Sequence, residues 1–264
     1  MRVCSIASGS SGNCIYIGDE NTNILIDAGI SRKRIVDGLV SIGVAPEDID
    51  GIFVTHEHSD HIQGISMMVK MFDTPVYATA GTLDAIRSKD KKGIISMQHL
   101  FEVHPDENIN IGTLNITPFS ISHDAADPVC YTVEHGKKKV SMATDLGFYN
   151  EYIVEHLSGS DVLLIEANHD ISMLESGSYP YHLKCRILSE YGHLSNEASG
   201  SLICKLIDKK LKHVFLAHLS KENNYPELAY QAVKCQIWEE MGINELPFNM
   251  AVANRDKPSE LVVL

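Results

Sequence analysis

The chain has 264 residues, of which 44% are hydrophobic, and its formal net charge is −13. This composition can supply a large buried core, and the acidic balance argues against a protein that coats nucleic acid through a basic surface. No stretch approaches the ~20 apolar residues that span a bilayer, and the first residues lack the apolar core of a signal peptide, so we expect a cytoplasmic protein without a membrane partner.

Six cysteines are scattered along the chain without a Cys-x-x-Cys pair. In an intracellular protein such residues are expected to be buried thiols rather than disulfides. They are Cys4, Cys14, Cys130, Cys185, Cys204 and Cys235.

Strand-like and helical patterns alternate through the first part of the chain. Short apolar runs bounded by turn residues predict strands, and Ser31 is of the type that caps a helix N-terminus. The expected elements are strands at 2–7, 14–18 and 23–27, a helix from Ser31 to about Ile42, a strand up to Thr55, a helix from about Ile62 to Phe72, a strand at 76–79 and a helix at 80–88.

The pattern of residues 94–144 predicts mainly strands, with a hairpin turn at 135–138. In the rest of the chain, strand-like and helical patterns alternate. The expected later elements are helices at 149–157, 183–191, 195–210 and 226–241, and strands at 162–166, 213–217 and 248–252. Strands in the middle of each half with helices beside them predict an α/β fold, a four-layer αββα sandwich. Because no Pro/Gly-rich linker interrupts the chain, we expect residues 1–264 to form one domain.

Four side chains that can bind metal fall within six positions: His56, His58, Asp60 and His61. They follow an apolar, β-branched run, so a strand should end just before them and hold them rigidly. Imidazole and carboxylate ligands suit zinc, manganese or iron. Four such groups are too many for one tetrahedral site with an open position, so we predict two metal ions.

A solvated loop and a metalloprotease site are the two alternatives for this segment. Histidines beside acidic residues can form a solvated loop, but a buried strand directly before them favours a metal site. The His-Glu-x-x-His motif of metalloproteases is absent, because Asp60 stands where its second histidine would be.

Further ligands should also follow apolar strands. His123, Asp145 and His218 occupy such positions, and so does Asp27, which is suited to hold a ligand imidazole from behind. Each of them alone is also compatible with a turn residue or a half-buried histidine. Their recurrence at four strand ends predicts that they belong to one site.

The pattern His56-x-His58-x-Asp60-His61, followed by His123, Asp145 and His218, resembles the metallo-β-lactamase-fold hydrolases. The resemblance covers nearly the whole chain and implies an αββα fold. It also implies a ligand assignment: His56, His58 and His123 on one ion, Asp60, His61 and His218 on the other, and Asp145 between them.

Glu166 ends a predicted strand, and His193 lies just before a predicted helix. This pair resembles the phosphodiesterase branch that contains the tRNA 3′-processing endonuclease, in which the glutamate orients a histidine that acts as general acid. The alternative is that His193 caps the helix and Glu166 forms an ion pair. We predict that His193, Glu166 and Asp60 take part in catalysis.

The segments Ser8–Asn13, Glu166–Asp170 and 182–196 are similar to the YycJ/WalJ (VicX) family. The resemblance implies a metal-dependent 5′→3′ DNA exonuclease whose nucleophile is a hydroxide shared by two divalent ions, zinc or manganese, with iron also possible. The resemblance implies DNA rather than RNA, and the absence of an inserted Gly/Pro-rich arm for gripping tRNA argues against a tRNA substrate. A small-molecule hydrolase acting on a cyclic phosphodiester, thioester or lactone stays an alternative, as does a non-enzymatic regulator. The turn at 9–13 fits a phosphate contact or a plain hairpin turn.

Overall fold

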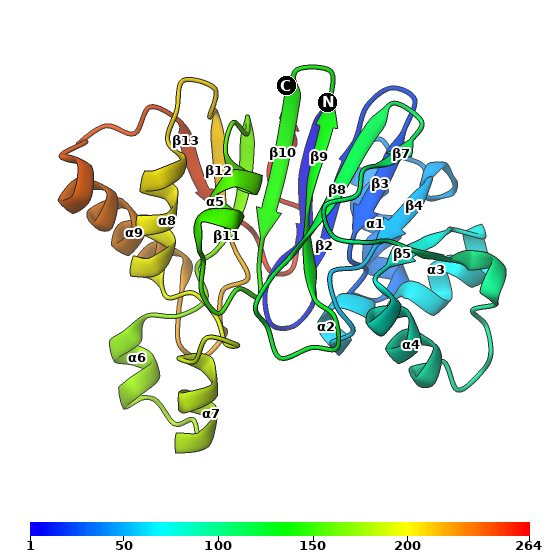
Figure 1. Ribbon diagram of the computed structural model, residues 1–264, viewed down its shortest axis with the longest axis horizontal. Coiled ribbons are helices and arrows are strands. Elements are labelled where there is room, and N and C mark those ends of the chain that lie inside the picture. Colours follow the sequence, from blue (N-terminus) through cyan, green and yellow to red (C-terminus); the bar gives the residue numbers. More distant parts are fainter. The chain divides into compact units, whose positions relative to one another are not determined.

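The computed structural model describes residues 1–264 and divides into two compact units (Figure 1). The first unit comprises Met1–Ser120, Ala125–Lys138 and Asn254–Leu264, and the second comprises Ile121–Asp124 and Lys139–Ala253. That the chain forms one domain stays a prediction. None of the helices is long and apolar enough to cross a membrane.

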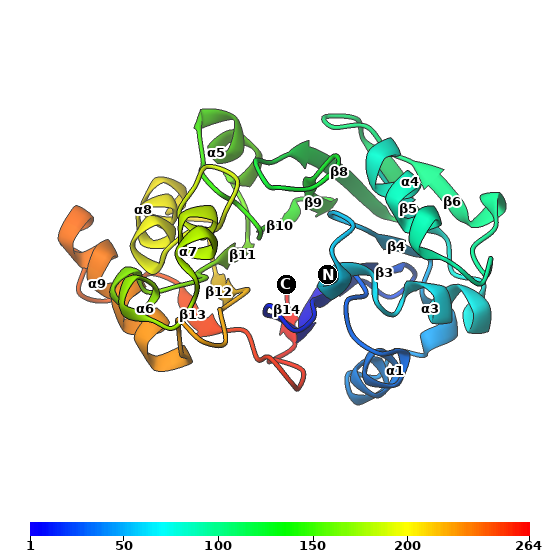
Figure 2. The ribbon, with the colours of Figure 1, turned by 90° about the horizontal axis from the view of Figure 1, so that it is seen from below.

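A seven-stranded mixed sheet forms most of the first unit. Its strands are β1 (Arg2–Ala7), β2 (Cys14–Gly18), β3 (Asn23–Ile26), β4 (Gly51–Phe53), β5 (Val76–Ala78), β6 (Leu100–Glu102) and β14 (Val262–Val263). They are ordered β14-β1-β2-β3-β4-β5-β6; the first four pair antiparallel, and β3 to β6 pair parallel. Because β14 pairs with β1, both ends of the chain lie at this sheet (Figure 2).

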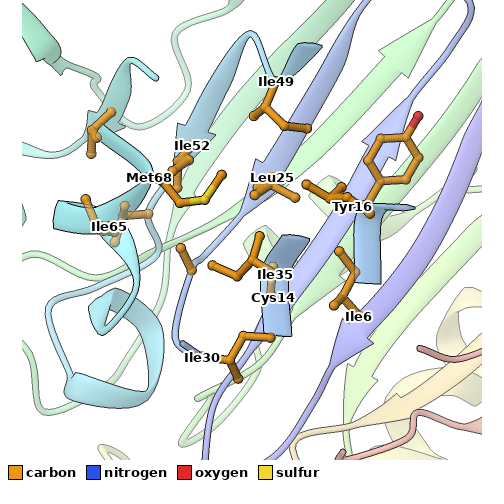
Figure 3. Packing of buried hydrophobic residues seen from close by; sticks show 14 of the residues in the cluster. Ile6, Cys14, Tyr16, Leu25, Ile30, Ile35, Ile49, Ile52, Ile65 and Met68 are labelled. Carbon is orange, nitrogen blue, oxygen red and sulfur yellow. The ribbon is translucent and has the colours of Figure 1, made fainter. Parts of the chain in front are cut away.

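Helices pack on this sheet and complete the core of the first unit. They are α1 (Arg32–Ser41), α2 (Ser59–Ile62), α3 (Ile65–Phe72) and α4 (Ala80–Lys89), with short 3₁₀ turns at Pro46–Asp48 and Met97–His99. Ile35 of α1 and Met68 of α3 meet Leu25 and Ile52 of the sheet, and all four are fully buried (Figure 3). The predicted N-cap is confirmed, because Ser31 Oγ accepts a hydrogen bond from the Arg34 amide.

The helix predicted from about Ile62 to Phe72 is present as α3, which begins three residues later at Ile65, whereas the short helix α2 before it was not predicted. The Gly64 amide donates to Ala28 O at 2.7 Å instead of continuing a helix. A Cβ at Gly64 would lie 2.4 Å from Ile30 O, so only glycine allows this approach. α2 carries Asp60 and His61 of the predicted metal motif.

Three antiparallel strands also belong to the first unit: β7 (Ile109–Ile111), β8 (Leu114–Ser120) and β9 (Val129–His135). β10 (Lys138–Ala143) follows after Gly136, whose φ of +59° suits a tight turn. The turn predicted at 135–138 is therefore present.

Four parallel strands form the sheet of the second unit, in the order β13-β12-β11-β10. Its remaining elements are β11 (Val162–Glu166), β12 (His213–Ala217), β13 (Asn249–Val252), α5 (Glu151–Leu157), α6 (Ile171–Ser176), α7 (Tyr181–Ile187), α8 (Asn196–Leu206) and α9 (Pro226–Met241). α8 and α9 lie side by side (Figure 1).

Two elements of the second unit differ from the prediction. α6 was not predicted, although Asp170 caps it by accepting a hydrogen bond from the Met173 amide at 2.8 Å. The helix predicted at 183–191 is α7, which begins and ends earlier. After α7 the chain turns back toward the helix end, and at Gly192 a Cβ would lie 2.1 Å from Ile187 O.

All six cysteines are free thiols, as predicted. The expectation that they are buried holds for Cys4, Cys14 and Cys130 but is wrong for Cys185 and Cys235, which are exposed. Both exposed thiols lie on helices, Cys185 on α7 and Cys235 on α9.

Candidate metal centre

Three predicted site residues follow strands directly or closely, and all three have left-handed backbone angles. Asp27 follows β3 with φ +61°, Asp145 follows β10 with φ +58°, and His218 follows β12 with φ +54°. Non-glycine residues rarely adopt this conformation, which stores strain and is concentrated at functional sites. The sharp turn at each strand end directs a polar side chain away from a rigid strand.

The ligand loop, defined as residues 55–61, brings its four predicted ligands together within the first unit. His56 Nε2 lies 3.0 Å from His58 Nδ1, and His61 Nε2 lies 3.6 Å from Asp60 Oδ2. His56 and His61 are fully buried. Buried nitrogen and carboxylate atoms at such separations suit a shared divalent cation.

Asp27 lies behind the ligand loop, where it was predicted. Its Oδ2 is 2.7 Å from His61 Nδ1, and its Oδ1 accepts a hydrogen bond from the Thr55 amide at 2.9 Å. A carboxylate on Nδ1 fixes the ring and leaves Nε2 as the metal-facing nitrogen.

The backbone of the ligand loop is fastened to two neighbouring segments. The Asn13 amide donates to Asp60 O at 2.8 Å, and the Ala28 amide donates to His61 O at 2.9 Å. A Cβ at Gly29 would lie 1.6 Å from Asp60 O. Asn13 also places its Nδ2 3.1 Å from His61 Nε2, a contact that we did not predict, because the turn at 9–13 gave no sign of a partner 48 residues away.

The second unit brings its own three predicted ligands together. His123 Nε2 and His218 Nδ1 lie 3.8 Å and 3.5 Å from Asp145 Oδ1. His123 Nδ1 lies 3.3 Å from Gly192 O, which leaves Nε2 directed toward Asp145. Burial lowers the pKa of His123, which favours the neutral imidazole that a metal requires.

Glu166, the last residue of β11, contacts both His193 and His218. Its Oε1 lies 2.8 Å from Nδ1 of each ring, while its Oε2 accepts hydrogen bonds from the Leu146 and Leu194 amides at 3.0 Å and 3.1 Å. Burial opposes ionisation of Glu166, but the charges and hydrogen bonds of the two histidines outweigh it and lower its pKa. Both oxygens are therefore engaged, which fits a carboxylate that orients imidazoles.

The predicted pair of Glu166 and His193 is thus present, whereas the contact with His218, 52 residues away, was missed. The alternative that His193 caps the following helix does not hold. Ser195 is the N-cap of α8, and its Oγ accepts a hydrogen bond from the Ala198 amide at 3.2 Å.

The donor chemistry of each group fits a divalent metal ion. In the second unit one polar atom each of Asp145, Glu166, His193 and His218 lie within 4.8 Å of one another, so the predicted ligands Asp145 and His218 adjoin the Glu166–His193 pair. Glu166 in the second unit and Asp27 in the first supply the carboxylates that commonly support ligand histidines. The side chain of His193 is 17% exposed, so of these four it is the one that reaches solvent.

Comparison with known proteins covers most of the chain. Residues 22–219 match the family described as "Beta-lactamase superfamily domain". Exodeoxyribonuclease WalJ of Streptococcus pneumoniae is 39% identical over 88% of this chain and 86% of its own length. Exodeoxyribonuclease YycJ of Bacillus anthracis is 37% identical over 90% of this chain and 89% of its own.

A solved structure agrees on the fold. The metallo-β-lactamase fold protein YhfI from Bacillus subtilis aligns with a TM-score of 0.71 over 98% of both chains, at 14% identity. The predicted α/β fold class is therefore confirmed.

Proposed function

Because this chain belongs to the metallo-β-lactamase superfamily, and within it to the WalJ/YycJ family, we propose that it is a metal-dependent exodeoxyribonuclease that degrades DNA in the 5′→3′ direction. The relatives named exodeoxyribonuclease match most of the chain, which favours a nuclease over a small-molecule hydrolase. A non-enzymatic regulator would need neither two groups of buried ligands nor an oriented histidine.

The proposed centre holds two divalent ions, zinc or manganese, with iron also able to bind such ligands. The assignment follows the ligand order of the family: His56, His58 and His123 on one ion, Asp60, His61 and His218 on the other, and Asp145 shared. Its support is the convergence of the ligands inside each unit and the carboxylates behind His61 and His218. When bound, two such ions would supply an activated water near neutral pH and stabilise charge on the phosphoryl oxygens.

The Glu166–His193 contact is the observation that carries the proposal of phosphodiesterase chemistry. A proton held on His193 Nδ1 faces the anionic Glu166 at 2.8 Å, so the second ring nitrogen is the one that can give a proton to a leaving oxygen. Glu166 is a positioning residue, because it acts through His193 and His218.

Asp60 completes the proposed catalytic set. Its side chain is 22% exposed, whereas that of His61 is fully buried, so Asp60 connects the ligand loop with solvent. In that position its carboxylate can orient the attacking water as well as bind an ion.

The test is an assay of end-labelled DNA and RNA strands with added Mn²⁺ or Zn²⁺. A label at the 5′ end should be released from DNA as the first product, a 3′ label should persist until late, and RNA should be degraded more slowly. Faster degradation of RNA, or early release of the 3′ label, would contradict the substrate or the direction. S-lactoylglutathione and a cyclic nucleotide serve as the small-molecule comparison.

A further inference from the structure

A cavity of about 370 Å³ lies within the first unit, directly beside the ligand loop. Four segments form its walls: the turn at 9–13, α2, the start of α3, and the end of α4 with the loop after it. Sites for small ligands fall in a range of roughly 300–1,000 Å³. The cavity reaches Asp60, so a ligand inside it would adjoin the candidate metal group.

The polar part of the cavity wall consists of hydroxyls, one ammonium group, one amide and two carboxylates. Lys89 contributes the positive charge, Gln63 the amide, and Asp60 and Asp90 the carboxylates; the hydroxyls come from Ser10, Ser11, Ser59 and Ser66. Hydroxyl and ammonium donors match phosphate oxygens and do not distinguish one base from another. These donors are therefore suited to bind a phosphate group whatever the base sequence of the strand.

Lys89 is held close to the candidate metal group. Its Nζ donates to Glu57 O at 2.7 Å, and Glu57 lies inside the ligand loop between His56 and His58. The carboxylate of Asp90 on the same wall is already engaged, because its Oδ2 accepts a hydrogen bond from the Ile95 amide at 2.7 Å. Lys89 is thus the cation that faces the cavity.

The apolar part of the cavity wall consists of isoleucines. Ile62, Ile65, Ile86 and Ile95 line the cavity, and Ile65 and Ile86 are buried in the core beneath it. Apolar surface of this kind suits the face of a sugar or a base. A charged, hydroxyl-rich part next to an apolar part is the chemistry of a nucleotide site.

We propose that this cavity, the Lys89 pocket, binds the terminal nucleotide of the strand being degraded, with Lys89 and the serine hydroxyls contacting its 5′-phosphate. The inference rests on the proposed nuclease function and specifies how the chain end is selected. A pocket that holds one terminal nucleotide beside the metal group favours removal of nucleotides from an end over internal cleavage.

The test compares two DNA strands that differ only in a 5′-phosphate or a 5′-hydroxyl. Initial rates at low substrate concentration give kcat/KM for each, for the wild type, Lys89→Met, Ser66→Ala and the control Lys92→Met. Lys92 is exposed, lies three residues from Lys89 and does not line the pocket, so the control removes the same charge. Metal content is measured for every variant, because Lys89 also contacts the ligand loop.

The wild type and Lys92→Met should prefer the 5′-phosphorylated strand by about tenfold or more, the size of one hydrogen bond to a charged group. Lys89→Met should reduce this ratio to near one, and Ser66→Ala should reduce it severalfold at unchanged metal content. DNA hydrolysis without a 5′-phosphate preference, or with a ratio that is the same in all four proteins, would overturn the pocket and leave the nuclease intact. No DNA hydrolysis by the metal-loaded wild type would instead contradict the proposed function.

Discussion

The Asp27 carboxylate lies 2.7 Å from His61 Nδ1, and both side chains are fully buried. We expect Asp27→Asn to weaken metal binding by about 10- to 100-fold, the usual effect of losing a carboxylate behind a ligand histidine. Competition with a chromogenic chelator measures the affinity. Asp106→Asn is the matched control, because Asp106 also has a left-handed backbone, with φ +66°, but lies in a turn outside the candidate groups. Equal affinity in both variants would argue against the role of Asp27.

His193→Ala should retain its metal and lose DNA hydrolysis by about 10²–10⁴-fold, the range that a positioned general acid supplies. The reason is that Glu166 orients His193 without either oxygen needing a metal. His182→Ala removes an exposed imidazole from α7 and should behave like the wild type. The test compares steady-state rates of DNA hydrolysis and metal contents among the wild type and the two variants. A His193→Ala enzyme of normal activity would exclude the general-acid role.

Gly29→Ala should displace the ligand loop, because its Cβ would lie 1.6 Å from the Asp60 carbonyl. Backbone atoms cannot move away cheaply, so we expect reduced metal affinity together with a large loss of stability. Gly43→Ala is the control: nothing lies within 4 Å of its Cβ, and its φ of +74° costs only about 1–2 kcal/mol. Thermal unfolding and metal titration of the two variants distinguish a local clash from ordinary backbone strain.

Asp19 provides a pH-dependent contribution to the stability of the first unit. Burial opposes its ionisation, but hydrogen bonds from Thr113 and from the Asn21 and Thr22 amides outweigh it and lower its pKa. Since the folded pKa lies below the unfolded value, this stabilisation is present above about pH 3.8 and is lost as the pH falls through the folded pKa.

Asp19→Asn should therefore lower the free energy of unfolding at pH 7 by about 1–3 kcal/mol, with a smaller difference from the wild type at pH 3. Urea denaturation at the two pH values measures both differences. Glu20→Gln, a change at the exposed neighbouring residue, should have little effect at either pH. A deficit for Asp19→Asn that grows on acidification would contradict the sign.

Much of the candidate site was predictable because its residues follow buried strands. An apolar run such as Ile24–Ile26 or Val214–Ala217 predicts a strand, and carboxylates and imidazoles that recur just after several such runs indicate one shared site. Hence Asp27, Asp145 and His218 could be named from the sequence, and each follows a strand in the structure.

The unpredicted features depend on contacts between distant residues. Nothing near Asn13 indicates His61, and nothing near Glu166 indicates that one oxygen serves both His193 and His218. The separation of α2 from α3 depends on close packing of Gly64 against Ile30 O, which no local pattern reveals. The two-residue strand β14 exists only because β1 offers a partner.

The central proposal is that seven side chains hold two divalent ions, with Asp145 shared between them. Quantitative metal analysis after dialysis with Mn²⁺ or Zn²⁺ tests it most directly, using the wild type and Asp145→Ala. The account predicts two ions per wild-type chain and fewer than one in Asp145→Ala, together with loss of DNA hydrolysis. A wild-type chain that retains no ion, or an Asp145→Ala chain that retains two, would contradict it.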